Sequence, residues 1–221
     1  MKFDDIRVYD KILEDSKMFI GFEIIENTPT SCTFANVSGT LEQNFDVLLS
    51  RLFTMGISFH KELFNRLQKS QSLTSFIEYE FNANKLNYYC KRILQTTNMS
   101  DKVYSQKSLY LITVLLEETV DSLRDIVIVA DGKNIKLNKN TIELFKISLK
   151  TLELNYTLFN RIIKGSDRLD ELSKFKDHKV LTKKIAFMTK YFNGDKYNSF
   201  IAGRLYDLSI ISTHINEEMF Y

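Results

Sequence analysis

Leu63-Phe-Asn-Arg66 occurs a second time as Leu158-Phe-Asn-Arg161, and both copies lie late in an amphipathic helical segment. The residues that follow are also alike: Leu67-Gln-Lys-Ser70 in the first copy and Ile162-Ile-Lys-Gly165 in the second. Each copy is followed by two further helical stretches. This arrangement predicts a duplicated three-helix unit.

Outward from the repeat, the spacing of apolar residues predicts an all-α fold with six long helices. The third helix of each set carries an acidic residue at a comparable place, Asp121 and Asp207. We therefore expect two tandem pseudo-symmetric three-helix bundles, residues 41–131 and 132–221. The expected helices cover residues 42–69, 73–96, 105–130, 140–164, 168–192 and 195–218.

Residues 1–40 are expected to form an N-terminal helix and a β-hairpin. The helix spans Asp4–Phe19, and Gly21 ends it. Gly21–Glu26 and Ser31–Val37 read as short strands joined by the turn Asn27-Thr-Pro-Thr30. A lone hairpin is marginally stable in water, so it is expected to pack against the helices.

Composition indicates an ordinary globular chain. Its 221 residues are 44% hydrophobic and 26% charged, which argues against wholesale disorder. The formal net charge of +2 implies no strong attraction to nucleic acid or to an anionic membrane.

The chain is expected to be cytoplasmic and without membrane insertion. Its two cysteines, Cys32 and Cys90, have no metal-type spacing, and buried thiols in a reducing compartment are the default. The first residues are acidic and do not resemble a signal peptide, and no stretch approaches the ~20 apolar residues that span a bilayer.

A row of acidic residues is the most distinctive chemical feature. Glu117, Asp121 and Asp125 are spaced by four residues, which places them on one helix face where they repel one another. One interpretation is a cation bound by these oxygens and by acidic groups of facing helices. The alternative is a solvated edge that Arg124 and nearby lysines neutralise.

Residues 20–126 resemble the archaeal branch of the PhoU family of phosphate-uptake regulators. The best match is Glu117-Glu-Thr-Val-Asp121, which has the family's acidic signature and is followed by Ile126. The second unit matches through Gly203-Arg-Leu-Tyr-Asp207. Further matching stretches are Ile20–Glu26 with Ser31-Cys32, Phe45–Phe53 and Asn84–Arg92.

The resemblance implies two bundles, each with a metal ion held by its acidic signature. A divalent or ferric ion (Fe, Zn, Mg or Mn) is expected. The first signature is intact, but its partner on the preceding helix has Asn84 in place of Asp, and Gly203 takes an acidic position in the second unit. The metal ligands implied are Glu117, Asp121, Glu80, Asn84 and Asp207.

The resemblance also implies a non-enzymatic regulator of phosphate uptake or phosphate signalling. Its expected partner is the ATPase subunit of a phosphate transporter, or a signalling or transcription protein. The strand-rich, AbrB-like DNA-binding domain of many archaeal relatives has no counterpart in the residues before Gly21, so direct nucleic-acid binding is not expected. The alternative is a helical protein-interaction scaffold with a decayed metal site. A homodimer is left open.

The remaining candidates favour structural roles. His60, His178 and His214 have no His or Cys at helical spacing and no Glu three residues before them, so a di-metal carboxylate enzyme is disfavoured. The lysines between Lys174 and Lys184 form either an anion-attracting face or a solvated helix surface. Gly56 inside a helix costs ~1 kcal/mol relative to Ala, which predicts close approach of another helix.

Overall fold

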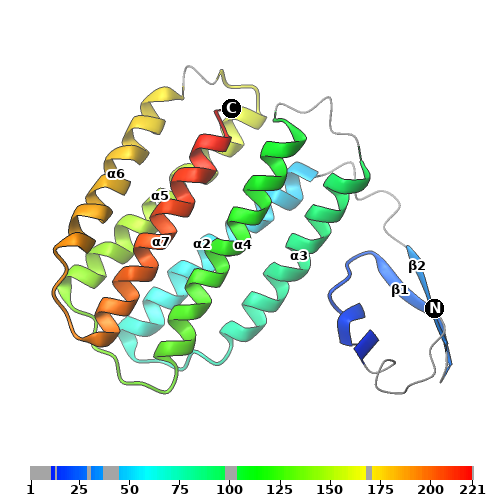
Figure 1. Cartoon of the computed structure of the whole chain (residues 1–221), viewed down its shortest axis with the longest axis horizontal. Coiled ribbons are helices and arrows are strands. Elements are labelled where there is room, and N and C mark those ends of the chain that lie inside the picture. The colour runs from blue at the N-terminus through cyan, green and yellow to red at the C-terminus, as the bar shows by residue number, and fades with distance from the viewer. Residues whose placement is uncertain are drawn as a thin grey trace.

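The computed structural model describes residues 11–12, 14–28, 31–36, 45–97, 104–167 and 171–220. The fold is predominantly helical, which confirms the all-α prediction (Figure 1). The long helices are α2 (Phe45–Lys69), α3 (Phe76–Thr96), α4 (Gln106–Ala130), α5 (Lys139–Ile163), α6 (Leu172–Lys190) and α7 (Lys196–Glu218).

The expected hairpin is present at the N-terminal side. Strands β1 (Phe22–Thr28) and β2 (Ser31–Asn36) pair antiparallel, and Arg92 of α3 holds their base. The Arg92 Nη2 donates to the carbonyl of Ile20 at 2.7 Å, and the guanidinium lies over the Phe22 ring. Before the hairpin, residues 11–12 and 14–16 are helical. Of the expected first helix Asp4–Phe19, residues 4–10 and 13 lie outside the described residues, and residues 17–19 are not helical. The turn residues 29–30 and residues 37–44 also lie outside the described residues.

The six helices pack in two sets of three that contact each other. α2, α3 and α4 contact one another, as do α5, α6 and α7, and the sets meet along α2–α5 and α4–α7. Aromatic pairs join α2 to α5: the rings of Phe53 and Phe159 lie 5.1 Å apart, and those of Phe64 and Phe145 lie 5.0 Å apart. Both clusters of buried apolar residues draw members from both sets.

The repeated tetrapeptide ends α2 and α5 in the same way. The carbonyl of Arg66 accepts a hydrogen bond from the amide of Gln71 at 2.9 Å, and that of Arg161 accepts one from Ser166 at 3.0 Å. The residues just before these amides, Ser70 and Gly165, have φ of 51° and 92°. Both ends are Schellman-type terminations with a left-handed residue.

The two arginines of the repeat also have matching partners. Arg66 Nη1 donates to Oγ of Ser75, the N-cap of α3, at 2.9 Å. Arg161 Nε lies 2.6 Å from Oε1 of Glu171, the N-cap of α6. Each copy therefore ties the end of one helix to the start of the next.

Candidate functional site

The acidic residues of α4 lie where the core meets solvent. The side chains of Glu117, Asp121 and Asp125 are 20%, 41% and 29% exposed, so all three border the same surface. Their spacing by four residues accounts for the shared face. Three neighbouring carboxylates need counter-charges, and the chain itself supplies them.

Arg124 lies among these carboxylates. Its Nη1 donates to Oε1 of Glu80 on α3 at 2.8 Å and to Oδ1 of Asp121 at 3.0 Å, and its Nη2 donates to Oδ1 of Asp125 at 3.3 Å. The hydrogen bond to Glu80 is the main cause that raises the pKa of Arg124, so the guanidinium stays charged. A side-chain cation therefore lies between Glu80 and Asp121, two of the predicted metal ligands.

A second arginine extends this arrangement to α7. Arg204 Nη2 lies 3.2 Å from Oδ2 of Asp125, and its Nη1 donates to Oδ2 of Asp207 at 3.0 Å. Asp125 therefore bridges two arginines on neighbouring helices, and the predicted ligand Asp207 joins the same network. We call this network the ion-pair ladder; its members are Glu80, Asp121, Arg124, Asp125, Arg204 and Asp207.

Two predicted metal ligands stand apart from the ladder. Glu117 forms its own ion pair with Lys91 of α3. The Oδ1 atom of Asn84 is buried and accepts no hydrogen bond from the described residues. No group of three or more His, Cys, Asp or Glu side chains in the described ranges has an arrangement able to hold a metal ion. In the fold, Glu80 and Asp121 pair with Arg124, and Glu117 pairs with Lys91.

Asp121 has competing influences on its ionisation. Burial raises its pKa, and the charges of Glu117, Glu80 and Asp125 raise it further, while Arg124 lowers it. The net direction is upward, so the ionised form of Asp121 is less favourable in the fold than in water.

A buried polar layer contains two pairs of histidine and serine. His60 Nε2 lies 2.7 Å from Oγ of Ser148, and His178 Nε2 lies 2.9 Å from Oγ of Ser212. Burial lowers the pKa of His60 to about 3 and that of His178 to about 4. All four side chains are at most 1% exposed, so no substrate reaches them from solvent. They bind helices together and do not form a nucleophilic site; the third histidine, His214, is exposed.

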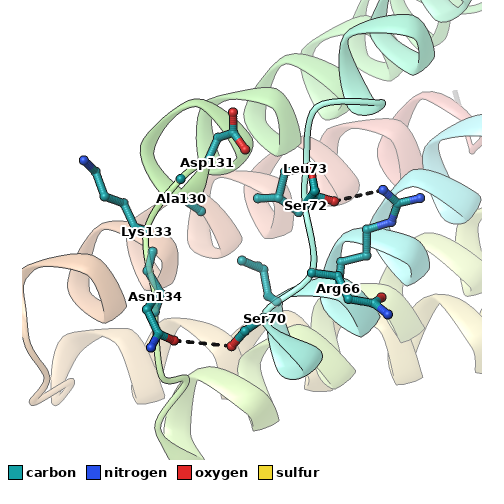
Figure 2. Close-up of a pocket in the computed structure, with 12 residues that line it drawn as sticks. Arg66, Ser70, Ser72, Leu73, Ala130, Asp131, Lys133 and Asn134 are labelled. Atoms are coloured by element: carbon teal, nitrogen blue, oxygen red, sulfur yellow. Dashed lines mark hydrogen bonds between the residues drawn. The ribbon is translucent and has the colours of Figure 1, made fainter.

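A cavity of about 400 Å³ lies between the end of α2 and the segment that follows α4. The two basic side chains that line it, Arg66 and Lys133, do not point towards each other (Figure 2). The Arg66 guanidinium donates to the Ser72 carbonyl at 2.9 Å, and Lys133 extends away from the other labelled side chains. Ser70 Oγ donates to Oδ1 of Asn134 across the opening at 3.4 Å. These polar groups connect two loops and do not converge on a common point.

Comparisons of the chain with protein-family models, with curated proteins and with solved structures gave no match. None of the helices in the described ranges is long and apolar enough to cross a membrane.

Proposed function

We propose that this chain is a non-enzymatic, PhoU-like helical adaptor that regulates phosphate uptake or phosphate signalling through protein partners. The partner expected from the resemblance is the ATPase subunit of a phosphate transporter, or a signalling or transcription protein. The observation that carries the proposal is the ion-pair ladder, in which arginines neutralise acidic positions that the resemblance assigns to a metal ion.

The proposal includes the origin of the fold in a duplicated three-helix unit. Its support is the repeat: Arg66 and Arg161 each bind the N-cap residue of the following helix, at 2.9 Å and 2.6 Å respectively. Leu63 and Leu158, which begin the two copies, are both fully buried. Equivalent terminations and equivalent links are what two descendants of one unit would retain.

In the proposed adaptor, the arginine side chains of the ladder take the place of a bound metal ion. A metal ion would hold α3 and α4 together through shared oxygen ligands, and Arg124 makes the same link between Glu80 and Asp121. Arg204 adds a link to α7 that depends on no bound ion. This favours the interaction-scaffold form of the hypothesis, with a decayed metal site.

A metal-dependent regulator is the second candidate. Two observations favour it: Oδ1 of Asn84 has no hydrogen-bond partner in the part of the chain that the structure describes, and the pKa of Asp121 is raised. A nearby cation would give the oxygen a partner and would favour the ionised carboxylate. Glu117, Asp121, Glu80 and Asn84 would supply the ligands in the first unit, and Asp207 a ligand in the second.

One experiment separates the two candidates. The protein is purified without chelator, and its metal content and thermal unfolding with and without EDTA are compared with those of a Glu117→Ala/Asp121→Ala variant. The adaptor proposal expects no stoichiometric metal in either protein and no change in Tm with EDTA. Metal bound one to one in the native chain and lost in the variant would establish the metal-dependent regulator instead.

The regulatory role is tested by affinity capture of the full chain from native lysate at low and high phosphate. A phosphate-transporter ATPase subunit, or a signalling protein, that co-purifies in a phosphate-dependent manner supports the proposal. If neither class of protein is recovered at low or at high phosphate, the proposed regulatory role is contradicted.

A further inference from the structure

The outer helix α6 exposes a line of large apolar side chains. Val180, Phe187 and Tyr191 are 65%, 65% and 63% exposed, and the rings of Phe187 and Tyr191 lie 4.9 Å apart. The spacings of seven and four residues place the three on one face of the helix. An apolar stripe this exposed is typical of a surface that another molecule covers.

A row of exposed lysines runs beside this stripe, on the side of the stripe nearer to α7. Lys176, Lys183 and Lys190 are exposed and spaced by seven residues. Phe175 lies on this same side of the stripe, and it shows that the side is the one nearer to α7. The centroid of its ring lies 4.9 Å from that of Phe220, just after α7. On the other side of the stripe, Lys184 is paired with Glu143 of α5 at 2.8 Å.

The neighbouring surface has the opposite charge. The ion-pair ladder contains four carboxylates and two guanidinium groups, so it carries an excess of two negative charges. Glu118 of α4 is exposed beside it. Tyr110 and Ile128, on the same helix, are 38% and 66% exposed, so α4 also combines charge with apolar contact area.

The order of the helices allows these two surfaces to meet in a symmetric pair. α7 contacts both α4 and α6 and lies between them (Figure 1). A two-fold axis running along α7 therefore places the α6 of each copy on the α4 of the other. Both charge-complementary contacts form at once, and the interface closes on itself. Ile210 of α7, 39% exposed, would lie near the axis.

The face is large enough for a stable dimer. Three adjacent helices about 30 Å long, each about 9 Å wide at the usual interaxial distance, offer roughly 800 Å² on each copy. Specific interfaces bury about 800 Å² per partner.

We propose that the face formed by α4, α6 and α7 is the interface of a symmetric homodimer, in which the lysine row of α6 contacts the acidic surface of α4 in the second copy. This inference does not rest on the proposed function. It gives the basic helix α6 one occupant, a second copy of the chain.

The test is the oligomeric state of the full chain, measured by sedimentation equilibrium at low and high salt. We expect a dimer in 50 mM NaCl. Its dissociation constant should be at least tenfold higher in 500 mM NaCl, because salt screens the charged contact. Lys176→Glu/Lys183→Glu on α6 should give monomers, as should Glu118→Lys/Asp121→Lys on α4, which changes the excess charge of that surface from −3 to +1. Lys150→Glu on α5, also an exposed lysine, is the matched control and should remain dimeric.

Mixing the two monomeric variants provides the sharpest test. In the mixed pair both contacts regain opposite charges, so a heterodimer should form where neither variant pairs alone. Circular dichroism and Tm establish that each variant is folded. A native chain that is monomeric in 50 mM NaCl would overturn the proposal, as would a dimer indifferent to both charge reversals. Lysine-dependent binding of a monomer to phosphatidylserine vesicles would assign α6 to a membrane surface instead.

Discussion

The Nε2 atom of His60 on α2 lies 2.7 Å from the Oγ atom of Ser148 on α5, and both side chains are fully buried. Ser148 Oγ also donates to the Phe145 carbonyl at 3.1 Å. Since the hydroxyl has one hydrogen, it accepts from His60, and the neutral ring carries its proton on Nε2. The Nδ1 atom has no hydrogen-bond partner among the described residues. A second proton would therefore place an unpaired charge in the core.

We expect the free energy of unfolding to decrease as the pH is lowered, because of this histidine. The pKa of His60 is lowered by burial to about 3, below the ordinary value of 6.5, so the unfolded chain takes up a proton that the folded chain refuses. Stability is fully present above pH 6.5 and is lost as the pH falls towards 3, by about 1.4 kcal/mol per pH unit for one such group. Urea unfolding at pH 7, 6, 5 and 4.5 measures it. His60→Gln should show a shallower decline, whereas His214→Gln should follow the native chain; equal slopes for all three would refute this assignment.

The two copies of the repeat provide a matched pair of backbone substitutions. Ser70 adopts φ of 51° where Gly165 adopts 92°, and a side chain in this region costs about 1 kcal/mol. Ser70→Gly should therefore stabilise the chain by roughly 0.5–1 kcal/mol, and Gly165→Ser should destabilise it by about 1 kcal/mol. Thermal or urea unfolding measures both. Ser70→Ala, which retains the strained backbone, separates the effect of the hydroxyl; destabilisation by Ser70→Gly would contradict the argument.

Substitution of Asp121 distinguishes a fold-stabilising ladder from a metal site. Because the pKa of Asp121 is raised, chiefly by burial, its ionised form is disfavoured in the fold. Asp121→Asn should leave the free energy of unfolding at pH 7 unchanged or higher by a few tenths of a kcal/mol, since the groups are partly exposed. Asp125→Asn, which loses contacts to both arginines, should lower it by about 0.5–1 kcal/mol. A bound metal would be indicated if Asp121→Asn greatly lowered the free energy of unfolding and if EDTA removed this difference between the variant and the native chain.

Gly56 tests the packing between α2 and α4. The glycine is buried, and an added Cβ would lie 3.7 Å from Cγ2 of Thr119, an ordinary van der Waals distance. The helices are neighbours here, as the sequence led us to expect, but they leave room for a methyl group. Gly56→Ala should stabilise the chain by about 0.5–1 kcal/mol through helix propensity, while Gly56→Leu should cost about 1–3 kcal/mol by overpacking. The midpoints of urea unfolding measure both effects. If Gly56→Ala destabilised the chain, α2 and α4 would be packed too tightly at this point to admit a methyl group.

Much of the candidate site was accessible from the sequence. The spacing of Glu117, Asp121 and Asp125 predicts their shared face, and the position of Arg124 among them indicates a neutralising partner. Arg204 was missed. Its bond to Asp125 depends on the contact between α4 and α7, and nothing in the local pattern of either helix indicates that contact.

The all-α class, the hairpin and the location of the repeated helix ends can be predicted from local sequence patterns, because they depend on interactions between residues a few positions apart. The pairing of charges between helices cannot be predicted in this way. Glu80 is matched with Arg124, Glu117 with Lys91 and His60 with Ser148 by the register in which helices pack. That register is fixed by the fit of many side chains across the whole core, and no short stretch of sequence contains it.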